Sequence, residues 1–550
     1  WLAANFKLKT GYVTELKKAI EKRRLDFEEL EIDVTDPVIV ETIRKTLTEG
    51  DDHQKLFALD TMQDLPLAPW KSDILELFES GSPVLKSKIL VMTSKHPDII
   101  PDEVITPLID HEDESLATRA MVSCGIRQNA STAAQLVELL SESSKERKAA
   151  AAASLILMED TSSTQANETI NKMLFDKDDD TQLAALSSVG HISGILSDEG
   201  LAKLLKDDSP DVRSRAAQLA EERSDESLIS PLVRNLDDPH TLPAARRALK
   251  SFDESTVAEK LGDVLNDEET SATLLMGAVR TLSDYRDHAD LEKIIEQGSS
   301  DELDLTKEVV DSLLKLARQS PLPEEIIHKS EALLREMAEE TYSALTLFQM
   351  FENDEKGYLI RDFLSTTVTK RKGIILKLAL LPFPDSPIET YMHALTAGES
   401  GAQSNVLEIL DNLLSIEIRE FIIPLFDDSD LSEKVDRGNQ FVSKQADATE
   451  AVANWLYSGN PWTSAIALDY SLNSDTTNGE MDWTKIQKDQ TIREVCSAQW
   501  AKDSSPLKTM KDFPTEEFIL KEASMYSTLE KTIFMKGVDL FRDISGEEVS

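Results

Sequence analysis

Apolar helical segments alternate with short acidic turns along most of this chain. In "LLKDDSPDVRSRAA" at 204–217, two leucines end one apolar face, a polar break follows, and Val212 opens a second face. Ser209 suits the N-cap of the second helix, Pro210 its first position, and Asp211 the positive end of its dipole. The stretch therefore predicts two helices joined by a turn.

The same pattern recurs at a period of about 30 residues. "LFESGSPVLKSKIL", "LIDHEDESLATRAM" and "LLSESSKERKAAAA" begin at Leu77, Leu108 and Leu139, which lie 31 positions apart, and the pattern returns at Leu204. One such hairpin is too small to bury its own apolar face, so the copies must stack. This predicts an all-α fold, an α-solenoid of stacked antiparallel helix pairs.

The repeating unit resembles a HEAT repeat. The resemblance rests on the acidic turn, the aliphatic residue after it, and the small residues of the second helix, such as the alanines at 149–153. It implies a HEAT-like architecture and specifies no ligand.

The organisation predicted along the chain has four parts. They are a basic amphipathic helix at 1–30, HEAT-like repeats at 31–320, further helical repeats at 321–515 with a polar loop near 430–450, and a distinct segment at 516–550. The stretch "QSPLPEE" at 319–325 marks the loop between the two repeat regions. Four tryptophans (Trp455, Trp462, Trp483, Trp500) are interpreted as thickening a terminal core rather than as forming a binding box.

Composition and charge exclude several classes of function. A formal net charge of −43 repels phosphates, which argues against a nucleic-acid partner. Two cysteines, Cys124 and Cys496, suggest neither a disulfide framework nor a zinc site and favour a reducing cytoplasm. The longest apolar runs, at 149–158 and 373–383, are too short to span a bilayer and are predicted to be buried helices.

The first residues differ in charge from the rest. Up to Arg24 the chain has seven basic and two acidic residues, a net charge of +5. The remainder therefore carries a net charge of −48. The basic side of an amphipathic helix at 7–24 suits contact with anionic headgroups, and a solvated first helix is the other interpretation.

No catalytic, cofactor-binding or metal-binding residue is assigned, so the chain is predicted not to be an enzyme and to need no cofactor. The acidic stretches at 176–182 and 352–363 lack required ligands of a calcium loop. The eight histidines are scattered without metal-ligand spacing, and neither cysteine lies in a nucleophile signature. The basic residues 370–372 are expected at a helix end or on a solvated face.

The last 25 residues, "YSTLEKTIFMKGVDLFRDISGEEVS", resemble the opening of a cyclic-nucleotide-binding domain. In that family a Glu-Lys pair precedes an apolar helix with the pattern "hhLK-x-V-x-LF", where h is an apolar residue. A second helix with the pattern "I/L-S-x-E-x-L" follows. The residues that match are Glu530, Lys531, Ile533, Phe534, Met535, Lys536, Val538, Leu540, Phe541, Ile544, Ser545, Glu547 and Val549. In that family the phosphate-binding cassette comes after this point, so this chain is not expected to bind a cyclic nucleotide by itself.

The whole chain resembles the cytoplasmic region of a bacterial multidomain family. The matching stretches are "LKKAIEKRRLDFEELEIDVTDP", the repeats, "NVLEILDNLLSIEIREFIIPLFDD", "NPWTSAIAL" and the closing segment. Members join an ATP/ADP-translocase-like membrane region to cytoplasmic HEAT repeats and a terminal cyclic-nucleotide-binding domain. The resemblance implies that this chain is a fragment of a larger membrane protein and lies at the cytoplasmic face of the inner membrane.

Three hypotheses about function follow. The leading one is a non-catalytic coupling scaffold, whose partners are adjoining domains of the same polypeptide or another protein. The alternative is a free-standing cytoplasmic scaffold that binds a protein on its concave face. A HEAT-like lyase or hydrolase would need a cluster of acid, base or metal-binding residues on one face, and the sequence suggests none.

Overall fold

The computed structural model describes most of the chain between residues 37 and 520. The gaps within it are 63–64, 95, 142–143, 160–162, 191–194, 301, 397–399, 443–445, 475–480, 503–504 and 511–512. All regular elements in the described residues are helices, and no strand occurs among them. The predicted basic helix at 7–24 and the nucleotide-domain resemblance at 526–550 lie outside these residues.

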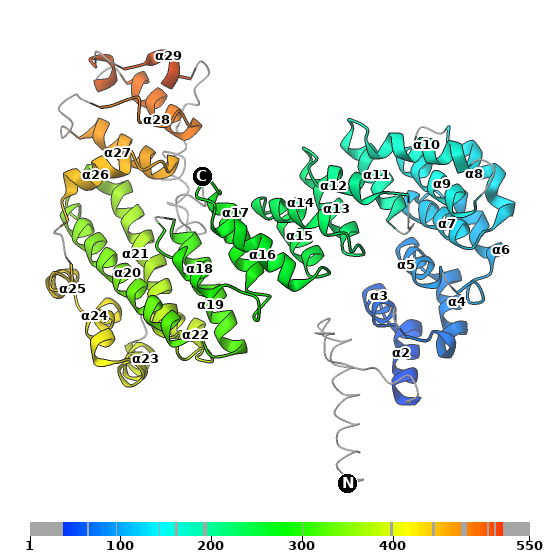
Figure 1. Ribbon diagram of the computed structural model, residues 1–550, viewed down its shortest axis with the longest axis horizontal. Helices are drawn as coiled ribbons and strands as arrows, with labels where there is room; N and C mark the ends of the chain where they lie inside the picture. Colours follow the sequence, from blue (N-terminus) through cyan, green and yellow to red (C-terminus); the bar gives the residue numbers. More distant parts are fainter. Residues whose placement is uncertain are drawn as a thin grey trace, which may run out of the picture. The chain divides into compact units, whose positions relative to one another are not determined.

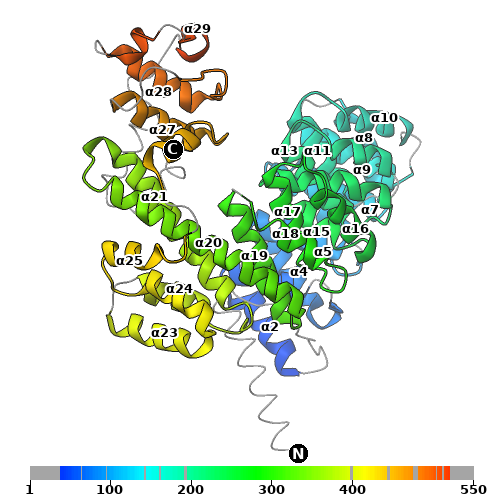
Figure 2. The ribbon, with the colours of Figure 1, turned by 60° about the vertical axis from the view of Figure 1, so that its left-hand side comes forward.

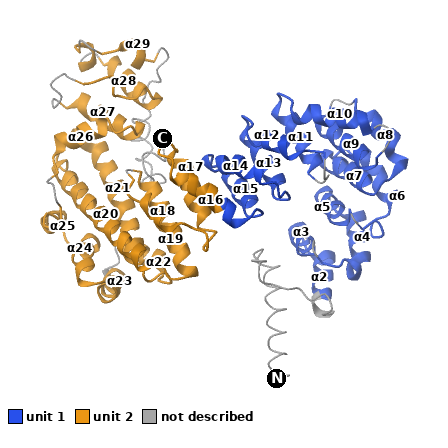
Figure 3. Cartoon of the chain, viewed as in Figure 1, with its two compact units in different colours: residues 1–257 blue, residues 258–550 orange. Residues whose placement is uncertain are grey.

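The chain divides into two compact units, unit 1 (residues 1–257) and unit 2 (residues 258–550) (Figure 3). The helices of unit 1 are α2 (Pro37–Glu49), α3 (Asp52–Thr61), α4 (Lys71–Ser80), α5 (Pro83–Thr93), α6 (Asp102–Ile105), α7 (Glu114–Ile126), α8 (Ala133–Leu139), α9 (Lys145–Leu157), α10 (Ser163–Leu174), α11 (Asp179–Val189), α12 (Asp198–Leu204), α13 (Pro210–Ala220), α14 (Ile229–Arg234) and α15 (Leu242–Leu249). The boundary falls within α16 (Glu254–Leu265).

The helices of unit 2 after α16 are α17 (Ala272–Leu282), α18 (Leu291–Glu296), α19 (Leu303–Gln319), α20 (Glu324–Met350), α21 (Tyr358–Ala379), α22 (Ile388–Thr396), α23 (Ser400–Leu413), α24 (Ile416–Phe426), α25 (Leu431–Gly438), α26 (Ala448–Leu456), α27 (Pro461–Asn473), α28 (Gln490–Ala501) and α29 (Thr515–Phe518). Unit 2 holds the longest described helices, α19, α20 and α21, among shorter ones. Short 3₁₀ turns, among them η2 (Ala68–Trp70), η3 (Thr106–Asp110), η4 (Ala130–Thr132), η5 (Glu226–Leu228), η6 (Asn235–Asp237), η7 (Glu355–Gly357) and η8 (Pro506–Lys508), connect or extend these helices.

The predicted repeat unit is confirmed as a helix–turn–helix. In the stretch 204–217, α12 ends at Leu204, and α13 begins at Pro210 with Asp211 in its first turn. Ser209 occupies the N-cap position with extended backbone, but its side chain accepts no capping hydrogen bond. In two other repeats the cap is complete, since Asp113 accepts from the Leu116 amide at 2.8 Å and Ser144 from the Arg147 amide at 3.1 Å.

The second helices of successive repeats form a continuous row in unit 1 (Figures 1 and 2). Each contacts the next, from α5 through α7, α9, α11 and α13 to α15. The first helices α8, α10 and α12 contact one another less. Closer packing in the second-helix row curves unit 1 towards that row, so the exposed side of the second helices is its concave face.

Small side chains permit this close packing. All five alanines at 149–153 of α9 are fully buried, and so are Ala117 and Ala120 of α7 and Ala216 of α13. Small residues let helix backbones approach, and the apolar area removed from water stabilises the stack by roughly 25 cal/mol per Å².

Polar side chains link the beginnings of successive second helices at the repeat spacing. Ser82 donates to Asp52 at 2.8 Å, Ser144 to Glu114 at 2.5 Å, Lys145 to Asp178 at 2.6 Å, and His240 pairs with Asp211 at 2.8 Å. These links are solvent-exposed, so water and salt screen them and each contributes little to stability. They keep neighbouring repeats in register rather than hold the fold together.

A stronger polar link is made by Arg213 in α13. Its guanidinium donates to the carbonyl oxygens of Asp207 and Asp208 at 2.8 and 3.0 Å and to Asn235 Oδ1 at 3.0 Å, and it pairs with Asp238. One side chain therefore joins the turn of its own repeat to the turn of the next.

We expect Arg213→Met to lower the free energy of unfolding by about 2 kcal/mol, because it removes donors from partly buried oxygen atoms. The matched control is Arg234→Met, which removes the same charge from an exposed position. Urea unfolding followed by circular dichroism measures both. Equal effects of the two substitutions would contradict the structural role of Arg213.

Unit 2 is built around a long hairpin of α20 and α21, which lie side by side (Figures 1 and 2). A loop forms where one was predicted, but it covers only 320–323, because α19 ends at Gln319 and α20 begins at Glu324, and it lies within unit 2. The prediction of a polar loop near 430–450 is wrong in its first part, where α25 forms. Asp430 caps this helix, and Val435 is buried. Only Val435 and Gly438 of this helix are buried, so its apolar surface is small and the sequence reads as polar.

The aromatic residues near the end of unit 2 pack into a core. The Trp483 ring lies 4.8 Å from Phe513 and 5.3 Å from Phe518 between ring centroids, and Trp500 lies 5.6 Å from Phe513. Trp455 makes an edge contact with Phe363 at 5.5 Å. Trp483 is buried, whereas Trp455, Trp462 and Trp500 are half-buried, so the interpretation as core residues holds fully for Trp483 alone.

Candidate functional site

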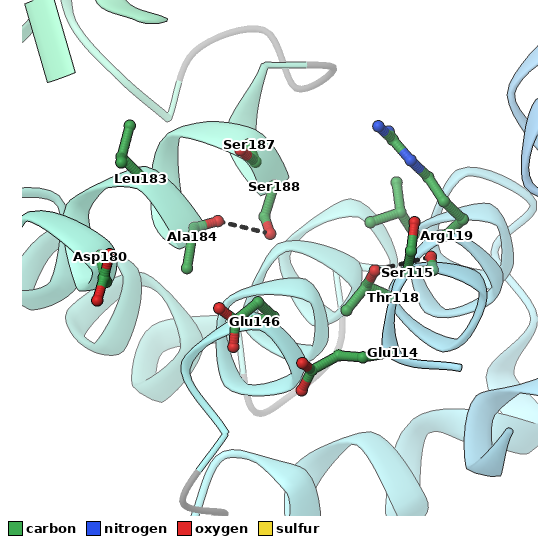
Figure 4. Close-up of a pocket in the computed structure, with 11 residues that line it drawn as sticks. Glu114, Ser115, Thr118, Arg119, Glu146, Asp180, Leu183, Ala184, Ser187 and Ser188 are labelled. Atoms are coloured by element: carbon green, nitrogen blue, oxygen red, sulfur yellow. Dashed lines mark hydrogen bonds between the residues drawn. The ribbon is translucent and has the colours of Figure 1, made fainter. Parts of the chain in front are cut away.

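A cavity of about 420 Å³ opens on the concave face of unit 1, along the exposed sides of α7, α9 and α11 (Figure 4). We call it the concave groove. Its lining residues are Glu114, Ser115, Thr118, Arg119, Val122, Glu146, Asp180, Leu183, Ala184, Ser187 and Ser188.

Helical spacing explains why these side chains share one face. The lining positions of α7 are 114, 115, 118, 119 and 122, and those of α11 are 180, 183, 184, 187 and 188, which form one stripe on each helix. Between them α9 contributes only Glu146, because its next turns consist of buried alanines. The groove is therefore a trough whose middle helix carries small side chains.

Charge is divided along the groove. Glu114, Glu146 and Asp180 lie in the first turns of their helices and are exposed, whereas Arg119 lies further along α7 and is half-buried. Figure 4 shows Glu114 and Glu146 on one side and the Arg119 head group with Ser187 on the other. The groove thus offers both signs of charge to a ligand.

Two of the four hydroxyl groups that line the groove are engaged within their own helices. Thr118 donates to the Ser115 carbonyl at 3.0 Å, and Ser188 donates to the Ala184 carbonyl at 3.0 Å. The lining contains no histidine, lysine or cysteine that would activate them as nucleophiles.

The two cysteines are buried in helix interfaces. Burial raises the pKa of Cys124 to about 11 and that of Cys496 to about 12, so both thiols stay protonated at neutral pH. Neither thiol is a reactive nucleophile under these conditions.

Both acidic stretches considered for calcium have structural roles. Asp178 caps α11 and pairs with Lys145, and Asp354 caps η7 and accepts a hydrogen bond from Tyr470 at 2.8 Å. Within the described residues no three His, Cys, Asp or Glu side chains are grouped so as to hold a metal ion. Likewise, no helix in that part of the chain is long and apolar enough to cross a membrane.

The expectation of a helix end for residues 370–372 is wrong, and a solvated face describes only Lys370 among them. They lie in the middle of α21, where Lys370 faces Asp304 at 3.4 Å and Arg371 pairs with Glu340 at 2.7 Å. Lys372 stacks over the Phe426 ring, 5.7 Å from its centroid. Acidic and aromatic partners on α19, α20 and α24 decide these roles, and they lie far away in sequence.

Lys372 is the most strongly perturbed of these cations. Its pKa is lowered to about 8, chiefly by burial and also by the nearby Lys434 charge, while Asp427 partly offsets both effects. Because the unfolded side chain titrates near 10.5, the unfolded state binds more protons between pH 8 and 10.5. The charged form of Lys372 therefore costs stability below pH 8, and this cost disappears as the pH rises.

We expect Lys372→Met to raise the free energy of unfolding by about 3 kcal/mol at pH 7, because methionine keeps the contact with Phe426 without the buried charge. The advantage over wild type should shrink between pH 8 and 10.5. Denaturant unfolding of both proteins at pH 7, 8.5 and 10 measures this difference in the free energy of unfolding. Groups that titrate alike in the two proteins cancel in the difference. A difference that stays constant with pH would contradict the assignment.

Sequence analysis missed the groove, and in particular Arg119. The repeat frame aligns α7, α9 and α11, so one signal existed: equivalent positions of successive second helices must line a common face. That frame does not reveal how far each side chain reaches.

Residues 198–273 match the family model described as HEAT repeats. No curated protein matches the chain. Among solved structures, human deoxyhypusine hydroxylase in complex with glycerol is 12% identical and covers 51% of this chain and 96% of its own, with a TM-score of 0.25. An engineered protein is 16% identical and covers 74% of this chain and 99% of its own, with a TM-score of 0.20.

Proposed function

We propose that this HEAT-like solenoid is a non-catalytic interaction and coupling scaffold, which links a membrane transporter-like part to a cyclic-nucleotide-sensing part of the same polypeptide. The observation that carries the scaffold role is the continuous row of second helices, whose exposed face holds the concave groove. HEAT repeats generally present such faces to proteins.

The linking role draws its support from the sequence. The basic segment 7–24 has the charge expected of a segment that follows a membrane helix on the cytoplasmic side. The closing residues resemble the start of a cyclic-nucleotide-binding domain. On this proposal the protein works at the cytoplasmic face of the inner membrane.

Coupling through such a chain has a simple physical basis. Each repeat contacts mainly its neighbours, so a small rotation between repeats is passed on and added along the row. A ligand that favours one curvature at one end would bias the other end by its difference in affinity for the two states.

Reading the gene in both directions tests the linking role. We expect long apolar runs before Trp1 and, after Ser550, a β-rich segment with a glutamate and an arginine in a phosphate-binding cassette. The intact product should sediment with membranes and resist a high-salt wash. Stop and start codons at both ends would overturn the linking role and leave the alternative, a free-standing scaffold that binds a partner protein in the concave groove.

A further inference from the structure

A second cavity, of about 360 Å³, lies between α19 and α21 in unit 2. We call it the lysine cavity. The two helices run parallel in a fixed register, since three contacts between this helix and the chain that includes α21 each join residues 66 positions apart. The contacts are Lys370 with Asp304, Lys377 with Asp311, and the Arg318 guanidinium with the Pro384 carbonyl. Two aligned helices therefore form the walls of the cavity.

Basic side chains dominate the lining of the lysine cavity. Lys307 of α19 and Lys370 and Lys377 of α21 line it, and Asp304 is the acidic residue among its lining residues. The chain as a whole has 102 acidic and 59 basic residues, so the cavity reverses the charge balance of the protein. A cavity with this balance attracts an anion.

Two of the three lysines have charge available for a ligand. Lys377 is engaged by Asp311 at 2.6 Å. The Lys370 ammonium lies 3.4 and 3.5 Å from the two Asp304 oxygens, well beyond the roughly 2.8 Å of a strong charge-assisted hydrogen bond. Lys307 is exposed and forms no ion pair with another described residue.

The helix register brings these two available charges close together. Lys370 faces Asp304, and Lys307 follows Asp304 by three residues, or about 4.5 Å along α19 at 1.5 Å per residue. Residues three positions apart lie on the same face of a helix. An anion between the Lys307 and Lys370 ammonium groups would therefore be within reach of both.

Gly373 gives the cavity its depth. It lies one turn after Lys370 on the same face of α21. Leaving its own helix aside, an added Cβ at Gly373 would meet the Met392 terminal methyl at 3.9 Å and no nearer described atom. Leu303 and Ile374 add apolar surface beside this open space. The basic edge of the cavity thus adjoins an uncharged part, and the volume is that of a small-molecule site.

The type of cation favours a phosphate over a carboxylate. No arginine occurs among the residues that line the cavity, and arginine is the side chain that holds a planar carboxylate through two parallel hydrogen bonds. Lysine binds phosphate oxygens as a point charge. A phosphate monoester carries a charge of about −2 at neutral pH, which matches two ammonium groups. Inorganic phosphate would leave the uncharged part of the cavity empty.

We propose that the lysine cavity binds a small organic phosphate monoester, with its phosphate between Lys307 and Lys370 and its organic group over Gly373 and beside Leu303. Such a ligand bridges two parallel helices and so restrains their spacing. The site goes beyond the proposed scaffold function and does not depend on it.

The test uses the full chain and 1-naphthyl phosphate, with binding measured by isothermal titration calorimetry at pH 7.5 and low ionic strength. We expect saturable binding at one site and weaker binding of inorganic phosphate. Lys307→Gln and Lys370→Gln should each weaken binding of the ester about fivefold, because each removes one charge that water screens. Asp304→Asn should strengthen it about threefold, because the repelling carboxylate is lost and Lys370 is released. A variant that merely loses stability would not gain affinity.

Two further variants test the place of the organic group and the specificity of the charge effect. Gly373→Met fills the open space without changing the charge, so it should abolish binding of 1-naphthyl phosphate and leave the weak binding of inorganic phosphate. The control is Lys329→Gln on α20, which removes a lysine that lies outside the lining and should leave both affinities unchanged. The melting temperature of each variant verifies that it is folded.

Four results would overturn the site. They are no saturable binding of 1-naphthyl phosphate by wild type, unchanged affinity in both lysine variants, no gain from Asp304→Asn, and undiminished binding by Gly373→Met. Equal affinity for inorganic phosphate would overturn the role of the organic group. Vesicles that contain phosphatidic acid present the same phosphate monoester in a membrane, and cosedimentation that requires Lys307 would overturn the assignment to a soluble ester.

Discussion

Replacing Gly125 by alanine is expected to destabilise unit 1 by about 3 kcal/mol, the upper end of the usual cost of overpacking. Gly125 lies on α7 where the helix meets α9, and an added Cβ would lie 2.6 Å from the Ser154 Cα and 3.0 Å from its carbonyl oxygen. Real Cβ atoms do not approach a backbone so closely, so α7 and α9 must move apart. The fully buried alanines of α9 would then lose contacts along the interface.

Urea unfolding of the full chain measures this effect, and amide hydrogen exchange locates it. Protection should fall first in α7 and α9. Gly262→Ala is the matched control, since its added Cβ meets only the Lys293 ammonium at 3.6 Å. In a helix interior that change should raise stability by up to about 1 kcal/mol. If Gly125→Ala were as mild as the control, the close approach of α7 and α9 would be refuted.

Gly438→Ala is expected to have an effect of similar size in unit 2. Gly438 ends α25, and an added Cβ would lie 2.2 and 2.6 Å from ring atoms of Tyr342 on α20. The ring cannot shift easily, because the tyrosine is buried, donates to the Phe421 carbonyl at 2.7 Å, and stacks on Phe441. We expect α25 to leave α20, with a loss of about 3 kcal/mol.

The control for this second prediction is Gly373→Ala in α21. Its nearest neighbour would be the Met392 terminal methyl at 3.9 Å, so alanine fits and should stabilise the helix slightly. The double variant Tyr342→Phe with Gly438→Ala tests whether the hydrogen bond from the Tyr342 hydroxyl to Phe421 determines the loss of stability. If Gly438→Ala lowers the free energy of unfolding as much with phenylalanine at position 342 as with tyrosine, the loss arises from the positions of the helix backbones and not from the hydrogen bond.

Part of the fold follows from local sequence. Pro210 and Asp211 start α13 as the turn chemistry predicts, and the leucines spaced by 31 positions at 77, 108 and 139 lie in successive first helices or turns. Local prediction failed where a helix has little apolar surface, as in α25, where Val435 is the only buried large side chain. Contacts with α20 stabilise that helix instead.

The sequence by itself determined the helical hairpin, its period and the stacking of its copies. Capping, helix propensity and apolar spacing act between residues a few positions apart, and the sequence shows these directly. Only the tertiary structure decided that Glu114 and Asp180, 66 positions apart, line one groove. Their meeting depends on small rotations summed over several repeats, and each rotation is set by side-chain packing between helices rather than by any local motif.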